Sequence, residues 1–135
     1  LAASPDPRLT EWRLGMRWNG VIWEDLPVAF PGELEAYLER PADLPFAPES
    51  IADAARRILD LVEELGCRHP GATAVLVSHQ DPVQAARIAL TGGTLDSLHH
   101  DKPGHAAVLT FVPGSRWQEV SRWEPAVAGA RFPPV

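Results

Sequence analysis

Residues 72–90, ATAVLVSHQDPVQAARIAL, carry an apolar run directly into the start of a helix. The first part, residues 72–77, is short, apolar and rich in β-branched side chains, which is typical of a buried strand. Asp81 is a favourable N-cap and Pro82 suits the first helical position. The pattern therefore predicts a strand followed by a helix over residues 82–90, closed by the pair of glycines behind it.

The junction between these two elements holds His79. Backbone N–H groups at the start of a helix attract anions, phosphate above all, and an imidazole beside them can donate a further hydrogen bond. In an open α/β sheet, ligands lie beyond the carboxyl ends of the strands, which is where His79 falls. A strand that ends in Ser-His is also a common turn into a helix, so this junction alone does not establish a site.

The rest of the chain divides into a few elements. Residues 50–65 form an apolar stripe at helical spacing, with Ser50 and Asp53 in a capping-box arrangement and Gly66 as the expected end. Prolines divide residues 24–49 into short pieces, which predicts an irregular lid or insertion with one brief helix near residues 34–38. Two further apolar stretches, residues 106–112 and 117–123, predict a hairpin or two neighbouring strands, and residues 126–135 form a Pro/Ala/Gly tail.

Composition limits the class of protein. The chain has 135 residues, 45% of them hydrophobic, which suffices for one core and leaves little room for two. Its net charge of -6 disfavours nucleic acid as a partner. Cys67 is the single cysteine, which fits a reducing cytoplasm. No signal peptide or apolar run of membrane-spanning length is present, so the sequence predicts a cytoplasmic protein without a membrane partner.

Four short motifs occur in a characteristic order. They are LTEWRLG at residues 9–15, WNG at residues 18–20, PES at residues 48–50 and VSH at residues 77–79. Their order and separation resemble the histidine phosphatase superfamily, in its phosphoglycerate mutase-like branch. The resemblance implies an α/β fold, a three-layer α/β/α sandwich, with residues 1–125 as the C-terminal portion of a single domain.

One motif of that family is absent from the chain. Its members begin with a strand that ends in Arg-His-Gly, whose histidine is the nucleophile, and no Arg-His-Gly occurs here. We therefore expect an N-terminally incomplete domain that lacks at least one βαβ unit. Removing a central strand would leave an exposed sheet edge. An N-terminal segment, a strand-swapped partner or a homo-oligomer contact is expected to cover it.

The resemblance implies phosphoryl transfer or phosphate monoester hydrolysis through a phosphohistidine. Carried over by position, Glu11 matches the carboxylate acid/base, and His79 matches the second, phosphate-binding histidine. Gln80 stands where the family has glycine, yet its backbone N–H can still donate to phosphate. The partner is then a small phosphorylated substrate or inorganic phosphate, and the mechanism needs no metal or other cofactor. The chain alone is expected to show no phosphatase activity.

Two classes of function stay open from the sequence. The first is a phosphatase or mutase of which this chain is a part, and the second is a non-catalytic phosphate-binding or interaction module that has lost the nucleophile. A flavodoxin-like binder that uses only the helix start is a weaker third, because it leaves Glu11 unexplained.

Several other residues have a functional and a structural interpretation. Arg13 and Arg17 are candidates for substrate contact, although exposed arginines are common. The side chains of Trp12, Trp18 and Trp23 can line the mouth of a pocket or pack in the core. The cluster of His99, His100, Asp101 and His105 invites a zinc hypothesis, but the spacing favours a solvated loop. The helix cap accounts for Glu49 and Ser50.

Overall fold

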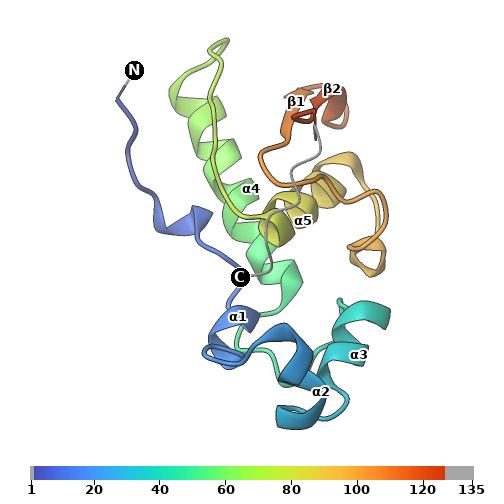
Figure 1. The fold of residues 1–135 in the computed structure, drawn as a ribbon. Helices are drawn as coiled ribbons and strands as arrows, with labels where there is room; N and C mark the ends of the chain where they lie inside the picture. The colour runs from blue at the N-terminus through green and yellow to red at the C-terminus, as the bar shows by residue number, and fades with distance from the viewer. Residues whose placement is uncertain (1, 127–135) are drawn as a thin grey trace.

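The computed structural model describes residues 2–126, and two packed helices form its centre (Figure 1). Helix α4 spans Ile51–Arg68 and helix α5 spans Gln80–Thr91, and the two pack against each other. Ser50 caps α4 as predicted, because its side chain accepts a hydrogen bond from the Asp53 N–H. The predicted end at Gly66 was wrong by two residues, since the helix continues through Gly66 to Arg68.

The start of α5 also differs from the prediction. His79, in an extended conformation, is the N-cap, and its carbonyl accepts the Val83 N–H at 3.0 Å. Asp81 does not cap the helix, because its carboxylate is bound by Tyr37 and Lys102 instead. Pro82 stays within the first turn, where its missing N–H leaves no hydrogen bond unmade. At the other end, Gly92 closes the helix with a φ of 79°, as the two glycines predicted.

Three short helices pack at one end of this pair (Figure 1). Helix α1 spans Leu14–Arg17, α2 spans Leu26–Ala29 and α3 spans Glu33–Glu39. Helix α3 includes the brief helix that was predicted near residues 34–38. Single turns of 3-10 helix at Pro7–Leu9, Trp23–Asp25 and Leu95–Ser97 complete the helical part.

The predicted strand at residues 72–77 is extended but pairs with no other strand within residues 2–126. Val75 is 81% exposed and Val77 is 79% exposed, although their apolar side chains predict burial. The described part of the chain therefore lacks the central parallel sheet of a three-layer sandwich. A strand requires a neighbour to satisfy its backbone groups, and none is present here.

The single sheet of the described residues is the predicted hairpin. Strand β1 spans Val108–Val112 and strand β2 spans Gln118–Trp123, and they pair antiparallel with an irregularity in register between Thr110 and Phe111. Strand β2 contacts α5, partly through an ion pair between Arg87 and Glu119. The predicted tail falls mostly in residues 127–135, outside the described residues.

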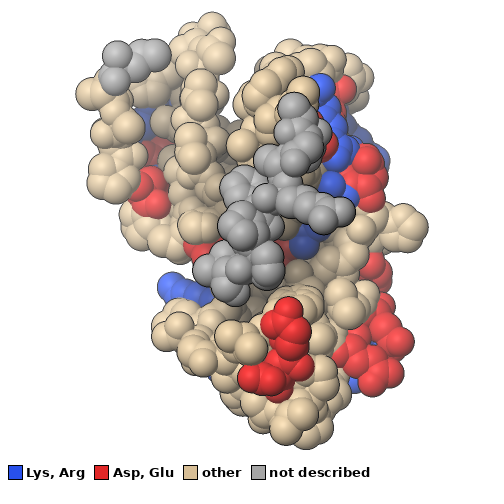
Figure 2. Space-filling model, in the orientation of Figure 1, with Lys and Arg blue, Asp and Glu red and all other residues tan. Residues whose placement is uncertain are grey.

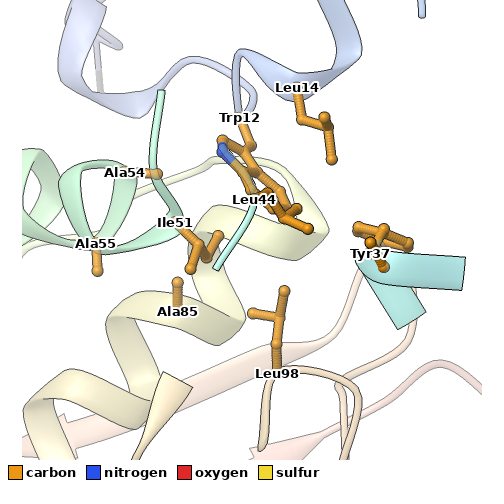
Figure 3. Packing of buried hydrophobic residues seen from close by; sticks show 10 residues of the cluster. Trp12, Leu14, Tyr37, Leu44, Ile51, Ala54, Ala55, Ala85 and Leu98 are labelled. Atoms are coloured by element: carbon orange, nitrogen blue, oxygen red, sulfur yellow. The ribbon is translucent and has the colours of Figure 1, made fainter. Parts of the chain in front are cut away.

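One core joins the short helices to the α4–α5 pair (Figure 3). Ile51 of α4 and Ala85 of α5 point toward one another, and Trp12 lies beside them. The core thereby fixes the loop before α1 against the start of α5. Its buried members are Trp12, Leu14, Ala36, Tyr37, Leu44, Ile51, Ala54, Ala55, Ala85 and Leu98. Within residues 2–126, no helix combines the length and apolar character needed to cross a membrane.

Candidate active site

His79 ends the extended segment and is the N-cap residue of α5, so it directly precedes the first backbone N–H groups of that helix, and its side chain makes no capping hydrogen bond to them. Glu11 comes from the loop between the first 3-10 turn and α1. The structure brings the two together, with His79 Nδ1 at 3.4 Å from Glu11 Oε2. Both side chains are about half exposed, at 55% and 50%, so solutes can reach them. A base, an acid and a set of anion-binding amides therefore meet at one point.

The backbone of the Glu11 loop is held by a single arginine. Arg57 of α4 donates from Nη1 to the carbonyl oxygens of Arg8 at 2.6 Å and Thr10 at 2.8 Å, and from Nη2 to that of Glu11 at 3.0 Å. Its Nε donates to the Glu49 carboxylate at 2.8 Å. We call this arrangement the Arg57 clamp. It uses the donors of one guanidinium to hold three backbone carbonyl groups of the loop.

Glu49 completes the Arg57 clamp from the other side. Its carboxylate accepts the Arg13 N–H at 3.2 Å, and its carbonyl accepts the Trp12 indole N–H at 2.8 Å. Burial of the Glu49 carboxyl raises its pKa, but the hydrogen bonds from Arg57 and the Arg13 backbone outweigh burial, so the pKa lies below the ordinary value. Glu49 is therefore an ionised part of the framework.

The other predicted site residues make different contacts. The Gln80 amide donates to the Pro103 carbonyl at 2.7 Å, which ties this side chain to the loop after α5. Arg17 is engaged by Glu33 through hydrogen bonds of 2.5 to 3.0 Å and lies over the Phe30 ring. Arg13 has an exposed side chain. Of the candidates, the structure thus brings together His79 and Glu11, and Arg17 is engaged in packing.

A hollow of about 170 Å³ opens beside Glu11. Aromatic rings form much of its wall, and Asp81 of α5 is one of its lining residues. Its lining consists of Glu11, Trp12, Leu14, Gly15, Trp18, Trp23, Tyr37 and Asp81. A larger hollow of about 310 Å³ lies over α2 and α3 and includes neither His79 nor Glu11. The smaller one is therefore the one that adjoins the site.

Tyr37 and Asp81 link this hollow to α5. The Tyr37 hydroxyl donates to Asp81 Oδ2 at 3.0 Å, and Lys102 forms an ion pair with Asp81 Oδ1. Burial, followed by the Asp81 charge, raises the pKa of Tyr37, so its hydroxyl stays protonated and keeps donating. The His99 ring N–H donates to the Tyr37 carbonyl at 2.8 Å. These contacts give His99 a structural role that the zinc hypothesis did not anticipate.

The described part of the chain has no cluster of metal-ligating side chains. No three His, Cys, Asp or Glu side chains of residues 2–126 meet as a metal ion would require. Asp101 is engaged by Arg87 and Arg122.

The residue that sequence reasoning missed is Arg57. It follows Arg56 on a helix with many charges, and nothing in the sequence separates the two. Only the packing of α4 against the loop at residues 8–11 shows that the side chain of Arg57 turns inward, to 15% exposure, while that of Arg56 stays 72% exposed.

Proteins of known family are similar to this chain in sequence. The family model of the histidine phosphatase superfamily (branch 1) matches residues 1–125. Phosphoserine phosphatase 1 of Hydrogenobacter thermophilus is 33% identical over 94 residues, which is 69% of this chain and 44% of that protein. The chain belongs to the histidine phosphatase superfamily.

Solved structures agree with this assignment. Mycobacterial glucosyl-3-phosphoglycerate phosphatase in complex with inorganic phosphate has a TM-score of 0.70 at 28% identity, covering 84% of this chain and 61% of that one. The same phosphatase in complex with VO3 has a TM-score of 0.74 at 29% identity, covering 88% and 62%. The chain therefore has the fold of part of a histidine phosphatase, and it spans less than two thirds of each of these relatives, from 44% to 62% of their length.

Proposed function

We propose that this chain supplies part of the active site of a phosphatase that hydrolyses a small phosphate monoester through a phosphohistidine. Glu11 is the acid/base and His79 binds the phosphoryl group, together with the backbone N–H of Gln80. The nucleophilic imidazole comes from polypeptide beyond these 135 residues. Membership of the histidine phosphatase superfamily and the phosphatase activity in the names of the relatives support this reaction.

The observation that carries the proposal is the approach of Glu11 to His79 at the start of α5. The pair lies 3.4 Å apart although the residues are far apart in sequence. A phosphoryl group placed on the α5 amides lies within reach of both side chains. Their solvent exposure leaves the position open to a substrate.

In the first step, the nucleophilic nitrogen attacks phosphorus and the bond from phosphorus to the ester oxygen breaks. The Glu11 carboxyl gives its proton to the departing oxygen, so that a neutral alcohol leaves. In the second step, water attacks the phosphohistidine, the Glu11 carboxylate takes its proton, and inorganic phosphate is released. His79 and the α5 amides donate hydrogen bonds to the equatorial oxygens, whose charge grows in both transition states.

The remaining part of the proposal concerns the exposed edge at residues 72–77. We propose that residues 1–125 form the C-terminal portion of one domain and that a strand from the rest of the protein pairs with this edge. The relatives support it, because each extends well beyond the region that this chain matches. Arg13, exposed beside Glu11, is a candidate to contact an anionic substrate.

Hydrolysis of p-nitrophenyl phosphate by the protein expressed from its complete reading frame tests the proposal. We expect turnover that falls by about 100- to 1,000-fold in His79→Ala, because one preorganised donor to the transition state is lost. His105→Ala is the matched control, since His105 is exposed and distant in sequence from the pair. A turnover of His79→Ala equal to that of the His105→Ala control would overturn the role of this histidine.

The second candidate is a module that binds phosphate without turnover because, in this case, the complete protein has no nucleophilic histidine. It predicts that the complete protein binds inorganic phosphate, that His79→Ala abolishes binding, and that no phosphate ester is hydrolysed. Calorimetric titration with phosphate beside the turnover assay separates the two functions.

A further inference from the structure

The hollow beside Glu11 has a distinctive aromatic wall. The rings of Trp18, Trp23 and Tyr37 stand nearly perpendicular to one another in each pair, at 80° to 86°, with centroids 5.6 to 6.3 Å apart. The three rings are thus in edge-to-face contact and form one aromatic cluster, and all three line the same hollow. A ring face carries a negative quadrupole, so such a cluster favours a cation over an anion.

The charged groups that line the hollow have one sign. Glu11 and Asp81 contribute carboxylates, and no lysine or arginine is part of the lining. The Asp81 charge is matched by Lys102, whereas the contacts of the Glu11 carboxylate within residues 2–126 are the Trp12 backbone N–H, at 2.8 Å, and His79. On the face shown in Figure 2, acidic side chains also gather over α2 and α3. An anionic group that enters this hollow meets uncompensated negative charge.

The cluster already holds one ammonium group of the chain itself. The Lys102 Nζ pairs with Asp81 and lies 5.9 Å from the centre of the Tyr37 ring. A carboxylate and an aromatic face thus bind a cation on one side of Tyr37. The hollow itself is lined by the Trp18 and Trp23 rings and by Glu11, the same combination of aromatic ring and carboxylate, and no lysine or arginine of residues 2–126 is among its lining residues.

The position of Glu11 shows which part of a substrate the hollow would take. Glu11 touches His79 on one side and lines the hollow on the other. An acid that protonates the leaving oxygen lies between the phosphoryl group and the alcohol. The alcohol part of the ester therefore extends into the hollow. Its volume of about 170 Å³ suits a small head group, since pockets for drug-sized ligands measure roughly 300–1,000 Å³.

We propose that the hollow selects the alcohol part of the substrate and that this alcohol is small and cationic, a phosphorylated amino alcohol with a methylated ammonium group. This inference rests on the proposed function for the place of the phosphoryl group, but the cation site itself does not depend on catalysis. As Glu11 gives up its proton to the departing oxygen it becomes negatively charged, which disfavours esters whose alcohol carries a carboxylate.

Binding of choline, followed by tryptophan fluorescence at constant ionic strength on the protein from its complete reading frame, tests the cation site without any phosphate. We expect a saturable change, and at least about tenfold weaker binding of 3,3-dimethylbutan-1-ol, the neutral isostere. Trp23→Ala should weaken choline by a similar factor, because Trp23 is 51% exposed and its removal spares the core. Trp123→Phe, an exposed position on β2, is the control and should leave choline binding unchanged.

Glu11→Gln separates charge from shape. It should weaken choline several-fold and leave the neutral isostere unchanged, because only the charge differs. Equal affinity for choline and its isostere, no saturable change, or an unaltered response in Trp23→Ala would each overturn the cation site.

Turnover then distinguishes this inference from the proposed function. We expect a kcat/KM for phosphocholine at least about tenfold above that for 3-phosphoglycerate, by the same charge preference. Hydrolysis without this preference contradicts the inference and leaves the phosphatase function standing. Choline binding without hydrolysis of any ester supports the cation site and contradicts the phosphatase function.

Discussion

The two sides of the His79–Glu11 pair are built in opposite ways. Glu11 lies on a loop that the Arg57 clamp fixes through three carbonyl oxygens and one buried carboxylate. His79 follows an extended segment, residues 72–77, that pairs with no strand within residues 2–126 and exposes its valines. This chain therefore holds the acid by its own contacts, whereas it holds the histidine mainly through the start of α5.

This difference indicates where the rest of the protein acts. A strand added along residues 72–77 would satisfy the backbone there and fix the direction from which His79 reaches the phosphoryl group. The Arg57 clamp needs no such addition. Stability measurements on the chain alone and on the complete protein can therefore tell the two regions apart.

The largest effect is expected at the Arg57 clamp. Arg57→Met keeps the apolar stem but leaves Glu49, which is 8% exposed, without its ion-pair partner. Breaking a buried pair in this way should lower the free energy of unfolding by about 3–5 kcal/mol. The neighbouring Arg56→Met, at 72% exposure, is the matched control and should change it by less than about 0.5 kcal/mol. Urea unfolding measures both, and equal effects would remove the clamp from the account.

A smaller effect should separate the chain from the complete protein. Val75→Ala should change the stability of the 135-residue chain by less than about 0.5 kcal/mol, because Val75 is 81% exposed. If a second strand covers this edge in the complete protein, as we propose, the substitution should cost about 1–2 kcal/mol there. Val28→Ala, at 84% exposure on α2, should be neutral in both proteins. The same small value for Val75→Ala in both would mean that the edge stays uncovered.

Ser78 is the polar link between the two regions. Its hydroxyl donates to the Leu9 carbonyl at 2.8 Å, next to the clamped loop. Ser78→Ala should cost about 0.5–1.5 kcal/mol, against no measurable change for the exposed Ser121→Ala on β2. If thermal unfolding gives both variants the same midpoint, the two regions are not joined through this bond.

The smallest effect is a pH dependence of the Arg57 clamp. Because the pKa of folded Glu49 lies below its ordinary value of 4.5, its contribution to stability is complete above pH 4.5 and is lost as the pH falls through the lower folded pKa. The stability difference between the protein and Glu49→Gln should therefore narrow on acidification. Urea unfolding at several pH values measures it. A difference that grows as the pH falls would contradict the assignment of Glu49 as an ionised group.

Local patterns predicted the longer elements, which are helices α3, α4 and α5 and the strands β1 and β2, but not the helices α1 and α2 or the 3-10 turns. The cap at Ser50, the αL glycine at Gly92 and the turn between β1 and β2 depend on short-range chemistry, which a sequence displays. The start of α5 was predicted two residues late, because Asp81 is used by Tyr37 and Lys102 from distant parts of the chain. Tertiary contacts of that kind leave no local signal.

The candidate site was predictable only in part, because some of its residues belong to sequence motifs and others are placed by tertiary contacts. The family motifs identified Glu11 and His79, and the structure places them side by side. The Arg57 clamp and the aromatic walls of the hollow depend on which faces of α3 and α4 turn inward. The pairing of residues 72–77 depends on a neighbour, so an apolar β-branched run predicts a strand without stating where its partner lies.

The central claim is that Glu11 protonates the leaving oxygen of an ester held by His79. The most direct test is how the loss of kcat/KM in Glu11→Gln depends on the leaving group. A nitrophenolate departs without a proton, whereas an alkoxide must be protonated as it departs. We predict that the substitution lowers kcat/KM of the complete protein by about 100- to 10,000-fold with an alkyl phosphate, and by less than about tenfold with p-nitrophenyl phosphate. Equal losses with both esters would contradict the claim.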